Sequence, residues 1–247
     1  MAELLAEPLI EARGAGRRYE RGGRPFWALR GASLTVAPGD FVTVFGRSGS
    51  GKSTLLNALA GLLPLTEGEA LIGGRSLAGL TDAQRSALRN RLVGYVPQAS
   101  GLVPTLTVID NVRLPWHLAG ERGPEPEGRA AELLAQVGLA GLEEQLPAAL
   151  SGGEMRRVAV ARALMCSPAV IVADEPTASL DPEAARGVIA LMDDFVKKGG
   201  AVLMVTHDDF SLGVSTCIHD MAGGTLTERI AESQLSRSGP ASASSAS

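Results

Sequence analysis

The clearest chemistry in the sequence lies in one glycine-rich stretch, Gly46-Arg47-Ser48-Gly49-Ser50-Gly51-Lys52-Ser53-Thr54. It has the Gly-x-x-x-x-Gly-Lys-Ser/Thr spacing of a phosphate-binding loop. The glycines let backbone N–H groups converge on phosphate oxygens, and a helix that follows directs its positive dipole end at the same anion. We therefore expect this loop to bind the phosphates of a nucleotide, with Lys52 at the β- and γ-phosphates and the Ser53 hydroxyl as a ligand of Mg²⁺.

The residues on both sides of the loop supply the structural context that the motif requires. The apolar run 41–45 is typical of a strand buried on both faces of a parallel sheet, and 53–63 is rich in Leu and Ala, which favour helix. The alternative is a glycine-rich turn that matches the pattern by accident. With 30 Gly and with Lys only at positions 52, 197 and 198, a chance match over the chain has a probability below about one per cent.

Two adjacent acids, Asp174 and Glu175, follow a second apolar run at 169–173. In enzymes with a phosphate-binding loop, an acid at the end of such a strand holds Mg²⁺ through its water shell, so we assign the metal to Asp174. Successive residues leaving a strand point in different directions, and Glu175 is then expected to face the γ-phosphate and to activate water. The alternative, in which Asp174, Glu175 and Pro176 only cap the next helix, is less favoured in a chain with this loop.

Three further side chains lie near predicted strands, and each is weak evidence alone. His207 follows the apolar run 201–205, so it can border one crevice with Glu175 at the carboxyl ends of the strands, although a lone histidine is more often structural. Gln98 leaves another strand-like run, and its amide can reach a metal-bound water or a phosphate oxygen. Tyr19, upstream of the loop, is by itself an ordinary strand residue.

The order of the predicted elements indicates an α/β domain built on a nucleotide-binding sheet. Short strands at 9–19 and 32–36, joined by a polar stretch, precede the loop. The pattern turns helical from 100 to 168, with a helix at 108–118 interrupted by Pro115, and we interpret this region as a helical lobe inserted between strands. The remaining helices are expected at 86–91, 129–137, 154–165 and 182–198.

Composition limits the partners and the location of the chain. A net charge of −4 and a pI near 5.5 argue against general nucleic-acid binding through a basic face. Cys166 and Cys217 belong to no Cys-x-x-Cys or Cys/His cluster, the first residues lack the basic region of a signal peptide, and no apolar run approaches the ~18 residues of a membrane span. We therefore expect a cytosolic chain with reduced thiols, and a disordered Ser/Ala-rich tail at 233–247.

One further motif, Leu150-Ser151-Gly152-Gly153-Glu154, lies between the loop and the acid pair. A serine and two glycines at a helix start make a second anion-binding end, although alone they would be interpreted as an ordinary capped helix. With the other motifs in this order, the chain resembles the ATP-binding subunit of ABC transporters over about Leu9 to Ile230. The resemblance implies an α/β P-loop NTPase core with a mainly parallel sheet, an N-terminal antiparallel β subdomain at 9–40 and an inserted α-helical subdomain at about 100–168, all within one domain at 1–232.

The resemblance also implies roles for single residues. Tyr19 matches the aromatic residue that stacks on adenine, and Gln98 matches the glutamine that links the metal to the membrane partner. His207 matches the histidine that contacts the γ-phosphate. Asp181, in Ser179-Leu180-Asp181, matches the acid that faces the other subunit of a dimer.

The resemblance further implies partners and a location. The family works as a head-to-tail dimer, identical or mixed, in which each ATP lies between Gly46–Thr54 of one subunit and Ser151–Gly153 of the other. ATP hydrolysis drives a separate transmembrane permease, which would hold the chain at the inner face of the cell membrane. The loop 94–120 is similar to the branch that serves lipoprotein release, macrolide export and related permeases. A non-transport mechanotransmission role and, less favoured, a soluble ATPase acting on nucleic acid or ribosomes remain alternatives.

The chain departs from the family pattern at three places. Met155 stands where Gln is commoner, Thr216-Cys217 replaces the usual Asp-Arg pair, and Gly223-Gly224 replaces the usual Asp-Gly turn. The first change is expected to matter little. We expect the other two to affect the packing of the C-terminal segment and not the ATP site.

Overall fold

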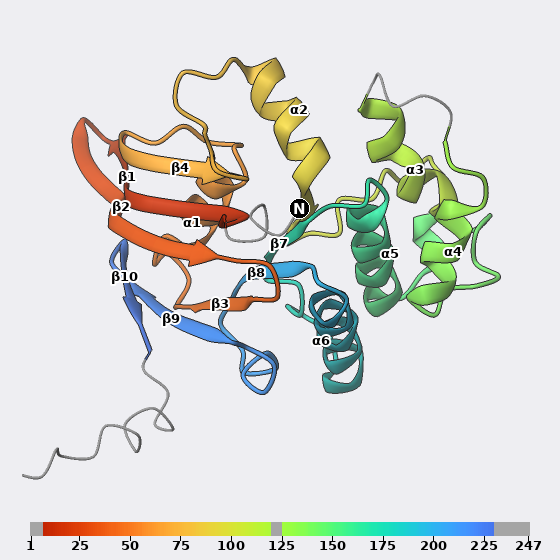
Figure 1. Ribbon diagram of the computed structural model, residues 1–247. Helices are drawn as coiled ribbons and strands as arrows, with labels where there is room; N and C mark the ends of the chain where they lie inside the picture. Colours follow the sequence, from red (N-terminus) through yellow and green to blue (C-terminus); the bar gives the residue numbers. More distant parts are fainter. Residues whose placement is uncertain (1–6, 120–124, 230–247) are drawn as a thin grey trace, which may run out of the picture.

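The computed structural model describes residues 7–119 and 125–229 and contains a six-stranded, mainly parallel sheet (Figure 1). The strand order is β10-β9-β3-β8-β7-β6, and β10 runs antiparallel to β9. The strands are β3 (Phe41–Phe45), β6 (Val93–Val96), β7 (Val170–Asp174), β8 (Ala201–Thr206), β9 (Cys217–Ala222) and β10 (Thr225–Glu228). Every residue of β3, β7 and β8 is buried, so the parallel sheet predicted from their apolar runs is confirmed. The tail predicted at 233–247 lies outside the described residues.

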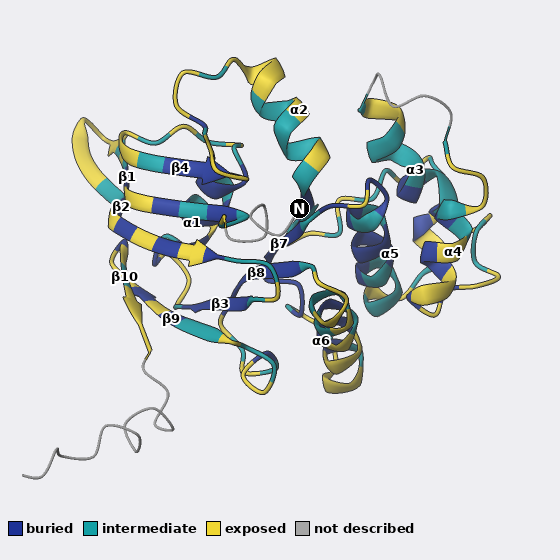
Figure 2. Cartoon of the chain, in the orientation of Figure 1, coloured by how far each residue is buried: buried dark blue, intermediate teal, exposed yellow. Residues whose placement is uncertain are grey.

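A second sheet is antiparallel and has the strand order β2-β1-β4-β5. Its strands are β1 (Ile10–Arg21), β2 (Arg24–Val36), β4 (Glu67–Ile72) and β5 (Arg75–Ser76). The expectation that the second strand begins at Ala32 is wrong, because β2 begins at Arg24, which pairs with Arg21 across a two-glycine turn. Both strands are mostly exposed towards this turn (Figure 2). Their side chains therefore lack the apolar alternation by which a strand is recognised in a sequence.

Helices cover both faces of the parallel sheet (Figure 1). They are α1 (Lys52–Leu59), α2 (Asp82–Leu92), α3 (Val108–Leu118), α4 (Arg129–Gln136), α5 (Gly152–Leu164) and α6 (Pro182–Lys197). On one face, Leu55 and Leu59 of α1 pack in a cluster that also contains buried residues of the antiparallel sheet. On the other face, Ala159 of α5 and Val188 of α6 pack against the strands. No helix within 7–119 and 125–229 is long and apolar enough to cross a membrane.

The helices α3, α4 and α5 also enclose an apolar cluster of their own, away from the sheet. Its buried members include Val108, Val112, Leu133, Leu134, Val158 and Met165. The break expected at Pro115 does not occur, because Pro115 lies in the last turns of a continuous α3, where its missing N–H leaves only one carbonyl without its helical donor. The helix α5 begins at Gly152, two residues before the expected start at Glu154, because Ser151 caps it.

A buried asparagine fixes the segment that leads into these helices. Asn111 of α3 is fully buried, and its Oδ1 accepts a hydrogen bond from the Val103 backbone N–H at 2.7 Å. Its Nδ2 donates to the carbonyl oxygens of Val103, Leu106 and Thr107 at 3.1, 3.1 and 2.9 Å. The side-chain amide thus ties the backbone of the 103–107 loop to α3, in addition to the hydrogen bond that the Leu106 N–H donates to the Val103 carbonyl oxygen.

We expect Asn111→Asp to lower the free energy of unfolding by roughly 2–4 kcal/mol. The new side chain has the same shape, but it replaces a donor by an acceptor that faces three carbonyl oxygens. Chemical denaturation measures the change. Gln136→Glu makes the same amide-to-acid change at an exposed position of α4 and should shift the value by less than about 0.5 kcal/mol. Equal effects of the two substitutions would contradict this role for Asn111.

Candidate functional site

The glycine-rich loop connects the end of β3 to the start of α1, as the sequence predicted. Two glycines permit this path. A Cβ at Gly51, whose φ is +111°, would lie 2.3 Å from the carbonyl oxygen of Ala28, and a Cβ at Gly46 would lie 2.6 Å from that of Met221. Larger residues are therefore excluded at both positions. The helix α1 then begins at Lys52 without a side-chain cap, which leaves its first N–H groups to serve a ligand in the loop.

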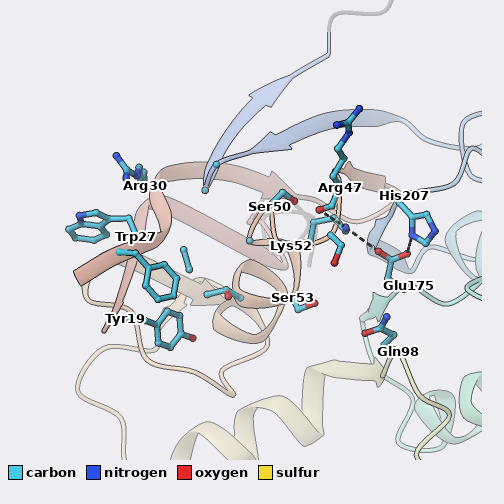
Figure 3. Close-up of a pocket in the computed structure, with 18 residues that line it drawn as sticks. Tyr19, Trp27, Arg30, Arg47, Ser50, Lys52, Ser53, Gln98, Glu175 and His207 are labelled. Carbon is cyan, nitrogen blue, oxygen red and sulfur yellow. Dashed lines mark hydrogen bonds and ion pairs between the residues drawn. The ribbon is translucent and has the colours of Figure 1, made fainter. Parts of the chain in front are cut away.

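The loop forms one wall of a pocket of about 1000 Å³ (Figure 3). The predicted site residues that line it are Tyr19, Arg47, Ser48, Gly49, Ser50, Gly51, Lys52, Ser53, Thr54, Gln98, Glu175 and His207. Gly46 is not among the lining residues, but its carbonyl oxygen accepts a hydrogen bond from Lys52 Nζ at 2.6 Å. The fold therefore brings residues from several separate parts of the chain to one space.

Three of the side chains that line this pocket contact one another on the side away from Tyr19 (Figure 3). Lys52 Nζ lies 3.1 Å from Glu175 Oε1, and His207 Nδ1 lies 2.6 Å from Glu175 Oε2 (Figure 3). The side chains of Lys52 and Glu175 are only 7% and 8% exposed, whereas that of His207 is 61% exposed. The ion pair is thus desolvated, and His207 remains accessible. Glu175 has a left-handed φ of 47°, a conformation that is strained for a non-glycine residue and is concentrated at functional sites.

Asp174 is buried at the end of β7, directly before Glu175. Its Oδ1 has no hydrogen-bond partner among the described residues. Burial raises the pKa of the Asp174 carboxyl above its ordinary value, and a hydrogen bond with Ser53 opposes that shift. Carboxylate and hydroxyl oxygens are the ligands that Mg²⁺ prefers. An unpartnered acid oxygen beside the Ser53 hydroxyl therefore fits a hard divalent cation.

The remaining predicted residues, Ser151, Gly152, Gly153 and Asp181, line a second pocket of about 540 Å³. Ser151 caps the start of α5, and Asp181 caps the start of α6. The two pockets have no lining residue in common. A single copy of the chain therefore does not bring its two predicted phosphate-binding ends to the same anion.

Part of the wall of the first pocket comes from residues that the sequence patterns did not indicate. They are Phe26, Trp27, Ala28 and Arg30 of β2, and Gly223 and Gly224 between β9 and β10. Phe26 pairs with Tyr19 across the hairpin, with ring centroids 5.8 Å apart, and the Arg17 guanidinium lies 4.9 Å from the Tyr19 ring centre. The sequence does contain one signal for this wall, which is the Phe26-Trp27 pair shortly after Gly22 and Gly23. A two-residue turn at these glycines sets the residues on either side opposite one another, and so pairs Phe26 with Tyr19.

The unusual C-terminal residues form a regular hairpin that also reaches the pocket. The Gly224 backbone N–H donates to the Ser50 carbonyl oxygen at 2.9 Å, and the Arg30 N–H donates to the Gly224 carbonyl oxygen at 2.8 Å. The expectation that Gly223-Gly224 would concern only C-terminal packing is therefore wrong. The turn supports the glycine-rich loop and lines the pocket beside it.

Comparisons with known proteins give the family. The family model for the ABC transporter matches residues 29–178. The lipoprotein-releasing system ATP-binding protein LolD of Alcanivorax borkumensis is 45% identical over 202 residues, which are 81% of this chain and 89% of that protein. The macrolide export ATP-binding/permease protein MacB of Rhodopseudomonas palustris is 42% identical over 83% of this chain, which spans 31% of that protein.

Solved structures agree with the family model. The dimeric structure of MJ0796, a bacterial ABC transporter cassette, has a TM-score of 0.84 and 33% identity, over 89% of this chain and 97% of that one. A dimeric post-hydrolysis state of the same cassette, bound to ADP and Pi, has a TM-score of 0.83 with the same identity and coverage. The predicted family and fold are thereby confirmed. This chain belongs to the ABC transporter family, as an ATP-binding subunit that hydrolyses ATP to ADP and phosphate.

Proposed function

We propose that this chain is the ATPase motor of a membrane transport complex and that it works as a head-to-tail pair. Each ATP lies between the glycine-rich loop of one copy and Ser151–Gly153 of its partner. The observation that carries this proposal is the placement of the two anion-binding ends in pockets without a common lining residue. A triphosphate that uses both ends must join two chains. The dimeric structures of the MJ0796 cassette support the same arrangement.

The residues of the pocket supply the hydrolysis chemistry. Lys52 exchanges the Glu175 carboxylate for phosphate oxygens, and backbone N–H groups at the start of α1 stabilise the same negative charge. Once released from Lys52, Glu175 accepts the proton of the attacking water as a general base. His207, which contacts Glu175 in the structure, donates a hydrogen bond to the γ-phosphate. Binding of ATP therefore replaces the ion pair between Lys52 and Glu175 with contacts to the phosphates.

The residues that we assign to a magnesium ion are Ser53, Asp174 and Gln98. Support comes from the unpartnered Oδ1 of Asp174 and from its hydrogen bond with Ser53. When bound, the ion neutralises charge on the phosphates. We assign the adenine to Tyr19, whose ring has Phe26 beside it. We assign Asp181, which lines the second pocket, to the surface that faces the partner copy.

The domain organisation follows the same proposal. One ATPase domain extends over 1–232, with a β subdomain at 9–40 and a helical subdomain at about 100–168. The strands β4 and β5 lie outside 9–40 but complete the antiparallel sheet of the β subdomain. The separate apolar cluster of α3, α4 and α5 supports a helical subdomain with some independence. Because α5 also packs against the strands through Ala159, the helices that can shift against the sheet while keeping this cluster are α3 and α4.

We further propose that a separate transmembrane permease receives the motion and holds the ATPase pair at the inner face of the cell membrane. The chain spans 89% of LolD, an ATP-binding protein, but 31% of MacB, an ATP-binding/permease protein. We propose that the complex releases lipoproteins or exports a drug or peptide. Purification of the chain from detergent-solubilised membranes should recover a membrane-spanning permease with it. Recovery of nucleic acid or ribosomes without a membrane protein would contradict this partner.

Glu175→Gln is expected to lower ATP turnover by roughly 10²–10⁴-fold, because it removes the general base. It should leave ATP binding intact, so the slow variant should accumulate as a dimer under saturating Mg-ATP. Phosphate release and analytical ultracentrifugation measure the two effects. Glu144→Gln, an exposed acid that lines neither pocket, is the control. A monomeric Glu175→Gln protein at saturating Mg-ATP would contradict the head-to-tail proposal.

Asp174→Asn is expected to raise the thermal unfolding midpoint of the nucleotide-free protein while lowering ATPase activity by roughly 100-fold. Burial raises the pKa of Asp174, so the folded chain keeps this proton to higher pH than the unfolded chain does. The ionised carboxylate therefore destabilises the fold above that pKa. Calorimetry at pH 7 should show the gain, and the gain should shrink as pH falls towards the pKa of an unfolded aspartate. A lower midpoint for the variant at pH 7 would contradict this account.

A further inference from the structure

The pocket at Ser151 has an unfavourable charge for a phosphate-binding site. Its ionisable lining residues are Glu154, Asp181, Glu183 and Arg157, so acids outnumber bases. The charged lining residues of the first pocket are Arg30, Arg47, Lys52 and Glu175, so bases outnumber acids there. The two surfaces attract one another when empty. A bound triphosphate, however, carries its terminal negative charge towards the acidic surface of the partner copy.

The donors of Ser151 that a phosphate would need are already in use. The Ser151 hydroxyl donates to Glu154 Oε2 at 2.7 Å, and the Ser151 backbone N–H donates to the same oxygen at 2.7 Å. The Glu154 N–H donates in return to Ser151 Oγ at 3.3 Å, which completes a capping box at the start of α5. These hydrogen bonds lower the pKa of the Glu154 carboxyl, so it is ionised at neutral pH. Hydrogen bonds to an ionised acceptor are about twice as strong as neutral ones.

We propose that Glu154 sets the ATP affinity of the composite site by competing with the terminal phosphate for the hydroxyl of Ser151. The inference rests on the head-to-tail pair proposed above. When the pair forms, the Ser151 hydroxyl exchanges one hydrogen-bond acceptor for another. It no longer donates to the Glu154 carboxylate and donates instead to the γ-phosphate bound to the other copy. Both acceptors are anions, so they repel one another. The repulsion is strong once the two surfaces have closed, because little water then lies between the charges to screen them. Glu154 thus weakens the ATP-bound pair and favours its opening after hydrolysis.

The chain itself contains a neutral version of the same cap. At the start of α2, the Thr81 backbone N–H donates to Gln84 Oε1 at 2.9 Å, and the Gln84 N–H donates to Thr81 Oγ1 at 3.3 Å. A glutamine in the third helical position therefore forms this box as a glutamate does. Glu154→Gln should keep the cap of α5 and remove only the charge and the stronger competition for the Ser151 hydroxyl.

The experiment compares Glu154→Gln with Glu154 in a Glu175→Gln background, where hydrolysis does not empty the site. The Mg-ATP concentration that gives half-maximal dimer is measured by sedimentation at low and high salt. We expect Glu154→Gln to lower this Mg-ATP concentration by about tenfold at low salt, since both composite sites of the pair change. The gain should fall as salt screens the charges. The thermal unfolding midpoint should fall only slightly, because the cap is retained with the weaker hydrogen bonds of a neutral acceptor.

Glu183→Gln is the matched control, because it removes one charge from the same pocket but makes no side-chain hydrogen bond to Ser151. Its effect should be about twofold or less. The gain from Glu154→Gln should also shrink in a Ser151→Ala chain, where the hydroxyl is absent. Equal gains from Glu183→Gln and Glu154→Gln, or no gain from a Glu154→Gln protein that remains folded, would overturn the proposal. If no variant dimerises with Mg-ATP, including the parent with Glu154, the head-to-tail pair itself is wrong.

Discussion

The site depends on one buried carboxylate, that of Glu175, which lies between Lys52 and His207. Each of these three residues comes from the end of a different strand or from the loop that follows it. The strands β3, β8 and β7 are neighbours in the sheet, and their register sets Phe45 opposite Thr206 and Asp174 opposite Val205. Parallel pairing therefore delivers all three side chains to one edge of the sheet. A buried acid without a cation would be costly, and Lys52 offsets that cost.

This dependence on strand ends explains how much the sequence could predict. The runs that became β3, β7 and β8 are short, apolar and buried on both faces, so the residues that follow them could be assigned to one edge of the sheet from the sequence alone. The spacing of the glycine-rich loop predicted its path in the same way, because Gly46 and Gly51 have no room for a side chain. The acid pair and His207 could be placed at the same edge once the strands before them were recognised.

The far wall of the pocket could not be predicted, because it depends on strands without an apolar pattern. The tip of β2 is exposed, and Phe26 reaches the pocket only because the two-glycine turn sets it opposite Tyr19. The contact of Gly224 with the carbonyl of Ser50 joins positions far apart in the sequence. Such contacts follow from tertiary packing and leave no local periodicity. The continuous α3 through Pro115 shows the same limit, since packing against α4 and α5 overrides a local preference.

Lys52 and Ser151, one at each proposed anion-binding end, both have partners within the chain. Lys52 donates to the Gly46 carbonyl and pairs with Glu175, and Ser151 donates to Glu154. A buried donor without an acceptor is costly, which accounts for the internal acceptors of Lys52. The exposed Ser151 hydroxyl has its internal acceptor, Glu154, through the cap of α5. Binding is then an exchange of partners, and its free energy is a difference between two anions. In the mechanism that we propose, the nucleotide affinity therefore depends on the internal acceptors as much as on the donors.

The helix α5 carries Ser151 of the second pocket and also holds the segment that brings Gln98 to the first pocket. It carries Ser151 at its start, and along its length Arg156 donates to the Pro97 carbonyl at 2.8 Å. Near its end, Arg162 donates to the carbonyls of Gly101 and Ser100, both at 2.7 Å. Gln98 therefore lies in a segment that is fastened on both sides to the helix bearing the second anion-binding end. Because Arg156 is buried, breaking its bond would leave a desolvated cation without an acceptor. Sliding of the Gln98 segment along α5 would therefore break these bonds.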